Sequence, residues 1–242
     1  MPALSSKPQL VVFGPSHFCE RARWGLDHAG ITYTEVRWAP GPHVWLARRM
    51  GLRRTTTPIL LLPSGTVVQG SSEILDHAGL GASDPALEQR CVERIGPLIR
   101  QFIYAATLRR AGSGVAAALV EGVSPGQAQA ARLLWPLTRQ LMAAGMQARP
   151  KLLPRLTQQI EIELAWLAGR LSSREDHGFD RSALTAASLL APLAVPDECP
   201  VSPLYRRVQL PEEIGQIVER WRGEPVLVWV RQTYRMHRNR AS

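Results

Sequence analysis

Two side chains near the N-terminus, Ser16 and Cys19, lie where the sequence predicts the start of a helix. Residues 9–13 are apolar and rich in β-branched side chains, as in a buried strand, and helical spacing begins near Phe18. The first amide groups of a helix have no partner inside it, and the helix dipole is positive there. A cysteine thiol in this position loses its proton more readily, whereas a serine hydroxyl can donate a hydrogen bond to the sulfur of a bound thiol. The pattern therefore indicates thiol chemistry, with Ser16 or Cys19 as the acting group.

Both side chains also have an ordinary structural interpretation. A serine that precedes a helix is frequently its N-cap, and a cysteine in the first turn is often a small buried residue. His17 and Phe18, between them, are candidates for the rim of a pocket. The residues themselves leave these alternatives open.

The elements that must position this turn follow in the next seventy residues. The order of the signals is strand, helix, strand, and then strand, strand, helix, which is typical of a thioredoxin-like arrangement. A short amphipathic piece connects the two halves of this pattern. The predicted strands span residues 9–13, 31–38, 58–62 and 66–68, and the predicted helices span residues 18–29, 43–52 and 72–79.

Only helical patterns follow the linker at residues 81–83. Asp84 and Pro85 are a strong helix start, because aspartate is a good N-cap and proline suits the first helical position. Helices are predicted over residues 85–108, 125–147, 150–171, 184–194, 211–221 and 225–237, with loops at 112–114 and 172–180 and an irregular crossover at 196–203. We therefore expect an α/β thioredoxin-like domain over residues 8–82 and an all-α helical-bundle domain over residues 83–242.

The composition is that of an ordinary globular protein, with 45% hydrophobic and 20% charged residues. Neither a signal peptide nor a membrane-spanning run is recognisable, so we expect a cytoplasmic protein without a membrane partner. The three cysteines and six histidines are scattered and lack the spacing of a metal site or a disulfide framework. We predict that the protein uses no metal.

The net charge of +9 is spread along the chain, except at residues 231–240. That segment holds Arg231, Arg235, Arg238 and Arg240 without any acidic residue. A basic terminal helix can bind phosphates, but arginines also suit the negative end of a helix dipole. We favour a solvated helix end and expect no nucleic-acid partner.

Four segments together resemble the cytosolic glutathione transferases, in particular bacterial members with serine or cysteine in the active-site turn. The first is Ser16-x-x-Cys19-x-x-x-Arg23, and the second is Thr57-Pro58 before a strand. The third covers residues 68–75, and the fourth, residues 184–188, resembles a capping box that starts a buried helix of the second domain. The segments occur in the family's order and cover most of the chain.

This resemblance implies that glutathione is the co-substrate. Ser16 matches the serine that stabilises the glutathione thiolate, and Pro58 matches a cis proline that exposes the backbone of Thr57 to the cysteinyl unit. Ser71, with Ser72 beside it, matches the serine that holds the γ-glutamyl carboxylate.

The sequence departs from the family pattern at Gly70, where an acidic residue or glutamine would meet the amino group of glutathione. Losing a charged hydrogen-bond partner costs about 1.5–3 kcal/mol, or roughly ten- to a hundredfold in affinity. Gln69 is predicted to point to the other side of the strand. Glu73, on the following helix, is a possible replacement.

The resemblance implies a homodimeric enzyme that conjugates glutathione to a small apolar electrophile held between the domains. Two alternatives stay open: a thiol–disulfide or reductive enzyme that uses Cys19, and a binding protein without catalysis. Trp135, Met142 and Trp166 lie on helices that could line the second pocket, although apolar residues at helical spacing are more often core.

Overall fold

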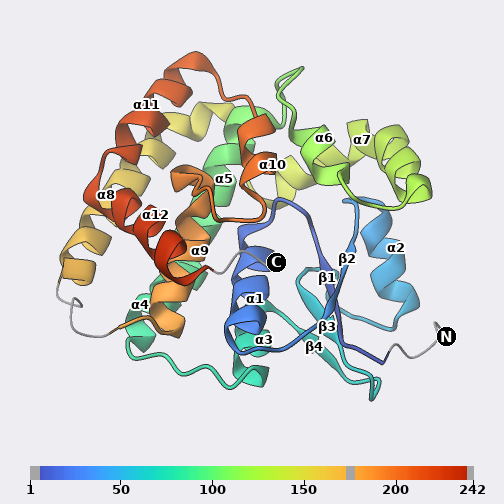
Figure 1. Cartoon of the computed structure of the whole chain (residues 1–242). Coiled ribbons are helices and arrows are strands. Elements are labelled where there is room, and N and C mark those ends of the chain that lie inside the picture. Colours follow the sequence, from blue (N-terminus) through green and yellow to red (C-terminus); the bar gives the residue numbers. More distant parts are fainter. Residues whose placement is uncertain (1–5, 173–177, 239–242) are drawn as a thin grey trace.

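The computed structural model describes residues 6–172 and 178–238 (Figure 1). Its N-terminal part contains a four-stranded mixed sheet with the strand order β2-β1-β3-β4. β1 and β2 are parallel because α1 crosses from one to the other, whereas β3 runs antiparallel to both β1 and β4. The bounds are β1 (Gln9–Val12), α1 (His17–His28), β2 (Thr34–Arg37), α2 (Pro42–Arg49), β3 (Ile59–Leu61), β4 (Val67–Gln69) and α3 (Ser71–His77).

Helices cover both faces of this sheet, as the alternation of apolar side chains along the strands requires. Leu10 and Val12 of β1 pack with Cys19 and Leu26 of α1 and with Ile74 of α3. On the opposite face, the core comprises Val11, Trp38, Ala47 of α2 and Ile59. The thioredoxin-like arrangement predicted from the sequence is therefore confirmed.

The rest of the described chain is helical, as predicted. The helices are α4 (Pro85–Arg90), the π-helical turn η1 (Cys91–Ile95), α5 (Gly96–Thr107), α6 (Val115–Val120), α7 (Pro125–Gly145), the 3₁₀ turn η2 (Pro150–Leu152), α8 (Leu153–Ser172), α9 (Arg181–Ala194), α10 (Ser202–Arg207), α11 (Glu212–Arg222) and α12 (Pro225–His237). Each predicted helix is found, with ends that differ by a few residues. The predicted loop at residues 172–180 lies partly outside the described residues.

The predicted helix over residues 85–108 is interrupted by the π-helical turn η1. The interruption comes just before Pro97, which has no N–H to donate and whose ring pushes against the preceding turn. Asp84 caps the start of α4 as expected, because its side chain accepts a hydrogen bond from the amide of Leu87.

Helix α9 is at the centre of the helical part and packs against α1 of the N-terminal part. Its predicted start is wrong. The N-cap is Asp180, whose side chain accepts from the Ala183 amide, so Thr185 lies one turn inside the helix. Ser188 does not cap either, since its hydroxyl donates to the carbonyl of Thr185. Thr185 has another role, described below.

The sequence analysis missed two short helices, α6 and α10. Neither is long enough to show a clear helical period, and α10 overlaps the segment that its prolines suggested was irregular. Both lie against the turn between β1 and α1, because a Cβ on Gly14 would come within 3.1 Å of Leu204 and 3.6 Å of the Ala118 carbonyl.

The interpretation of the C-terminal arginines as a solvated helix end is wrong for Arg238. This side chain is buried and forms ion pairs with two acids of α1, at 3.0 Å from Glu20 Oε1 and 2.6 Å from Asp27 Oδ2. Burial raises the pKa of Glu20, and the positive charge of Arg238 partly offsets this rise. The end of α12 is thereby anchored to the helix that follows the candidate active-site turn.

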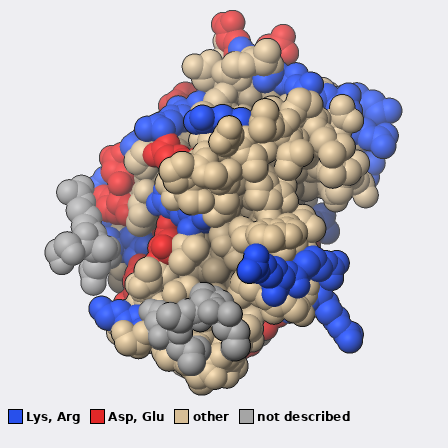
Figure 2. Space-filling model, turned by 90° about the vertical axis from the view of Figure 1, so that its right-hand side faces the viewer, with Lys and Arg blue, Asp and Glu red and all other residues tan. Residues whose placement is uncertain are grey.

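The neighbouring arginines of this segment also have partners. Arg231 donates to the Arg222 carbonyl at 2.7 Å, and Arg235 lies 3.8 Å from Glu198; Arg240 lies outside the described residues. On the face shown in Figure 2, lysines and arginines surround a broad uncharged area and do not form one basic patch.

No helix in the described part of the chain is long and apolar enough to cross a membrane. All three cysteines are free and buried. Within residues 6–172 and 178–238, no three histidine, cysteine, aspartate or glutamate side chains gather as a metal site would require; His177 lies outside these ranges.

Candidate active site

Ser16 is the N-cap of α1, directly after β1 and the Gly14-Pro15 break. Its Oγ accepts a hydrogen bond from the backbone amide of Cys19 at 3.3 Å. A serine hydroxyl can donate one hydrogen bond in addition to those it accepts. The O–H of Ser16 is therefore free to donate to a ligand, and the cap and the expected catalytic role are compatible.

Cys19 has a different environment, although it lies only three residues further on. Its side chain is fully buried beside Leu26 and Ile74, and its Sγ lies 3.5 Å from the Thr57 hydroxyl. It does not line the cavity described below. The structural interpretation of Cys19 thus describes its position better than that of an accessible nucleophile.

Thr57 and Pro58 lie beside this turn, and the peptide bond between them is cis. The carbonyl of Pro58 accepts from the Gly70 amide at 3.0 Å, which joins this loop to the start of α3. Gln69 points away from the cavity, as expected, and its amide group donates to the carbonyls of Arg54 and Thr56 at 2.9 and 2.8 Å.

Gly70 has a backbone conformation that other residues rarely adopt, with φ of +119° and ψ of 149°. A Cβ at this position would overlap the carboxylate of Glu73, at 2.1 Å from Oε2. The carboxylate of Glu73 therefore occupies the space in which a side chain at position 70 would begin. It lies 3.5 Å from Arg54 and is partly exposed. Glu73 thus places an acidic group beside position 70, although it is not itself one of the residues that line the cavity described below.

Ser71 and Ser72 begin α3, and both hydroxyls accept from Nη1 of Arg21, each at 2.9 Å. Arg21 is fully buried, and it also donates to the Thr185 hydroxyl at 2.8 Å and forms an ion pair with Glu88. Burial lowers the pKa of Arg21 to about 10, against the opposing effect of Glu88, and the guanidinium is still cationic at neutral pH. A positive charge therefore lies directly behind Ser71.

The sequence analysis did not identify Arg21. Arginine is only rarely buried unless it is paired, and its partners Glu88 and Thr185 are far away in sequence. The helical position of Arg21 between Cys19 and Arg23 gives no indication of which of these side chains faces the second domain.

A cavity of about 410 Å³ lies between the sheet and the helical part. Ser16, Thr57, Pro58, Gly70 and Ser71 all line it, whereas Cys19 and Ser72 do not. The N-terminal wall also includes Phe13, Pro15, His17, Phe18, Pro40, His43, Thr55 and Thr56, and the helical wall comprises Arg100, Ile103, Tyr104, Val115, Ala118, Leu119, Met142, Met146, Pro192, Tyr205 and Val208.

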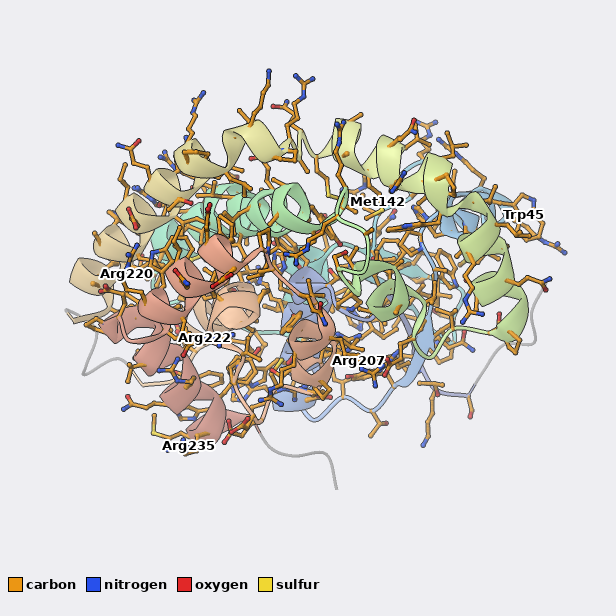
Figure 3. All side chains as sticks on the ribbon, turned by 90° about the horizontal axis from the view of Figure 1, so that it is seen from above. Trp45, Met142, Arg207, Arg220, Arg222 and Arg235 are labelled. Atoms are coloured by element: carbon orange, nitrogen blue, oxygen red, sulfur yellow. The ribbon has the colours of Figure 1, made fainter. Side chains whose placement is uncertain are left out.

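Of the three candidates for the helical wall, only Met142 lines the cavity. It comes from the C-terminal half of α7 and lies nearer the middle of the view in Figure 3 than Trp45 of α2, which lies at the edge. Trp135 packs against the helical core, and Trp166 lies under the guanidinium of Arg90 at 4.1 Å.

Two histidines of the N-terminal wall are held in the neutral form. Burial, together with the nearby Arg100, lowers the pKa of His17 to about 3, and Nε2 lies 3.1 Å from the Gly96 carbonyl, to which it donates. Burial also lowers the pKa of His43, whose Nδ1 accepts from the Gly41 amide at 3.0 Å. Neither ring contributes a positive charge to the cavity at neutral pH.

A family model described as "Glutathione S-transferase, N-terminal domain" matches residues 15–79, which include the turn at Ser16, the cis bond and the start of α3. Many solved glutathione transferases share the fold. Residues 15–79 thus match the N-terminal domain of the glutathione S-transferases, and the chain as a whole has the glutathione transferase fold. No curated protein is similar enough in sequence to count as a relative.

Three solved structures are similar in fold to nearly the whole chain. Glutathione transferase GSTFuA3 from Phanerochaete chrysosporium is 12% identical, with a TM-score of 0.63 and coverage of 96% of this chain and 97% of that one. CsGST63524 of Ceriporiopsis subvermispora, solved with glutathione, is 14% identical, with a TM-score of 0.58 and coverage of 97% and 98%. The β-etherase LigF from Sphingobium sp. strain SYK-6 is 15% identical, with a TM-score of 0.55 and coverage of 94% and 99%. At such identities the likeness concerns the fold.

Proposed function

We propose that this protein is a glutathione transferase-like enzyme that binds reduced glutathione on the N-terminal wall of the cavity and joins its sulfur to a small apolar electrophile. The observation that carries the proposal is the convergence of Ser16, Thr57-Pro58 and Ser71 on one cavity whose opposite wall is mostly apolar.

In this proposal, the tripeptide extends along the N-terminal wall. The γ-glutamyl carboxylate accepts from the hydroxyl of Ser71, with the charge of Arg21 behind it, and Ser72 acts indirectly by helping to hold Arg21. The amino group binds the carboxylate of Glu73, which stands where a side chain at Gly70 would be. The backbone of Thr57 meets the cysteinyl unit.

The cysteinyl sulfur then lies at Ser16, whose free O–H donates to it. A hydrogen bond to the thiolate favours the charged form, so the thiol releases its proton to solvent at a lower pH. The thiolate attacks the electrophilic carbon, a carbon–sulfur bond forms, and the leaving group departs with the electron pair of the bond that breaks. Ser16 thus lowers the cost of forming the nucleophile, and the cavity holds the two reactants together.

The alternative in which Cys19 reacts fits the geometry less well, because its Sγ is buried and absent from the cavity lining. The alternative of a binding protein without catalysis rests on the missing acidic side chain at Gly70. The carboxylate of Glu73 lies beside that position, which weakens the support for this alternative.

The decisive test compares Ser16→Ala with Cys19→Ala in conjugation of glutathione to 1-chloro-2,4-dinitrobenzene. We expect Ser16→Ala to lower kcat/KM about ten- to a hundredfold, the effect of losing one hydrogen bond to a charged group. The pH at which bound glutathione loses its thiol proton, followed by the ultraviolet absorbance of the thiolate, should rise by about one to two units in this variant. Cys19→Ala should retain activity within about threefold.

Because Ser16 is also the N-cap of α1, both variants require urea unfolding curves, and Ser16→Ala is expected to lose about 1 kcal/mol of stability. Loss of activity in Cys19→Ala alone, at unchanged stability, would assign the chemistry to Cys19. A wild-type protein that binds glutathione but conjugates nothing would support the binding-protein alternative.

The homodimer, the cytoplasmic location and the domain boundary at residue 82 that the sequence analysis expects stay predictions. Sedimentation of the purified protein would test the first of them.

A further inference from the structure

The helical wall of the cavity contains a charged side chain for which the described part of the chain supplies no counterion. Arg100 of α5 lines the cavity, and among the described residues that line it, Arg100 is the one side chain with a full charge at pH 7, because His17 and His43 are neutral. None of the described lining residues is acidic.

The contacts of Arg100 within the described chain are few. Its guanidinium lies over the ring of Phe18, 5.6 Å from the centroid, and its Nε is buried without a hydrogen-bond partner. Burial lowers its pKa, a direction that shows the cost of keeping the cation in this place. Because a partly buried cation without a counterion is costly and a buried unsatisfied donor such as its Nε calls for an explanation, Arg100 has the properties of a group that a ligand completes.

A second buried donor without a partner lies in the same wall. The hydroxyl of Tyr205, on α10, is buried and has no hydrogen bond among the described residues. The surface around these two polar groups is apolar and includes Ile103, Leu119 and Met142. The helical wall thus combines apolar surface with two donors that both favour an acceptor.

We propose that the second substrate is a flat apolar compound with an anionic group, such as an aromatic carboxylate or sulfonate, whose charge is bound by Arg100 and whose body packs on Phe18, Ile103 and Met142. The assignment of this compound as a substrate rests on the function proposed above, whereas its binding does not require catalysis. Glutathione has two carboxylates, and the proposed site on the opposite wall provides a partner, Ser71, for only one of them. The experiment must therefore distinguish binding of the second substrate by Arg100 from binding of glutathione by Arg100.

A matched pair of fluorescent probes tests the binding directly. 8-Anilinonaphthalene-1-sulfonate and N-phenyl-1-naphthylamine have the same ring system and differ in the sulfonate. Arg100→Gln should weaken binding of the sulfonate about ten- to a hundredfold, as expected for a hydrogen bond to a charged group, and change binding of the neutral probe by less than about threefold. Arg100→Lys should give an intermediate loss, because an ammonium keeps the charge without the planar fork.

Arg110→Gln is the control variant, because Arg110 is exposed beyond the end of α5 and does not line the cavity. It removes the same net charge and should leave the affinity for both probes unchanged. Equal weakening of both probes by Arg100→Gln, or of neither, would overturn the proposal. So would a tenfold weaker affinity for glutathione with unchanged affinity for the sulfonate, because Arg100 would then serve the co-substrate.

A second pair of compounds connects binding to the reaction. 4-Chloro-3,5-dinitrobenzoate carries the charge that 1-chloro-2,4-dinitrobenzene lacks, and Arg100→Gln should lower kcat/KM about ten- to a hundredfold for the benzoate and little for the neutral compound. If neither compound is conjugated while the probes still discriminate, the proposed function fails and the anion site stands. Conjugation of both with equal sensitivity to Arg100→Gln would overturn the substrate class and leave the proposed function intact.

Discussion

The two walls of the cavity differ in how their polar groups are satisfied. On the N-terminal wall, Ser16 caps α1, and Ser71 accepts a hydrogen bond from the buried Arg21. On the helical wall, Arg100 and Tyr205 keep buried donors without partners among the described residues. A wall whose polar groups are held by the fold is ready to bind one fixed ligand, whereas a wall with unpartnered donors gains its hydrogen bonds only when the ligand arrives.

This difference agrees with the two halves of the proposed reaction. In the proposed reaction glutathione is the constant reactant, and its proposed site is built from short motifs on strand ends and helix starts. The electrophile is the variable part, and its wall comes from five separate helices (Figure 1).

The side chain that joins the two parts of the molecule most directly is Arg21, so its removal should have the largest effect. Arg21→Met leaves Glu88 without this buried partner and removes the support of Ser71 and Thr185. We expect a loss of about 3–5 kcal/mol in the free energy of unfolding, the usual result of breaking a buried ion pair. Urea unfolding measures it.

Arg206→Met is the matched control for this variant, because Arg206 and Asp197 form an ion pair on the surface. Its loss should cost at most about 1 kcal/mol. A similar effect in the two variants would mean that Arg21 does not join the two parts energetically.

His17, on the N-terminal wall of the cavity, should make the free energy of unfolding depend on pH. Its pKa is lowered to about 3 in the folded protein because the ring is buried, against about 6.5 in the unfolded chain. A base with a lowered pKa stabilises the fold above the unfolded value, and this stability is lost as the pH falls from about 6.5 towards 3. Between pH 7 and pH 5 the loss from His17 should be about 2 kcal/mol.

His17→Gln removes the titration and keeps a donor for the Gly96 carbonyl. The difference in unfolding free energy between pH 7 and pH 5 should therefore be about 2 kcal/mol smaller in this variant than in the wild type. His77→Gln, at the exposed end of α3, should reproduce the wild-type difference. An unchanged difference in His17→Gln would show that His17 is not held neutral.

The sequence predicts the N-terminal wall much better than the helical wall, for a physical reason. The proposed roles of Ser16, Pro58 and Ser71 depend on local geometry, which short motifs record: a cap, a proline bond and a helix start. The sequence offers Glu73 only as a possible replacement for an acid at position 70, whereas the structure shows that the Glu73 carboxylate lies where a Cβ of residue 70 would be.

The helical wall depends on how distant helices meet, and no local pattern records that. Arg100 is one of 29 lysines and arginines, and nothing beside it in the sequence indicates that it lies over Phe18 without a counterion. The same limit explains the wrong interpretation of Arg238, whose partners Glu20 and Asp27 are more than two hundred residues away.

The central claim, that glutathione binds the N-terminal wall with Glu73 in place of an acid at position 70, is tested most directly by calorimetric titration of reduced glutathione into the wild type and Glu73→Gln. We predict saturable binding to the wild type at submillimolar concentration. The affinity of Glu73→Gln should be about ten- to a hundredfold lower, the effect of losing one charged hydrogen-bond partner. Glu213→Gln, which removes the same charge at an exposed position of α11, should bind like the wild type. Millimolar or undetectable binding to the wild type, or equal affinity in Glu73→Gln, would contradict the claim.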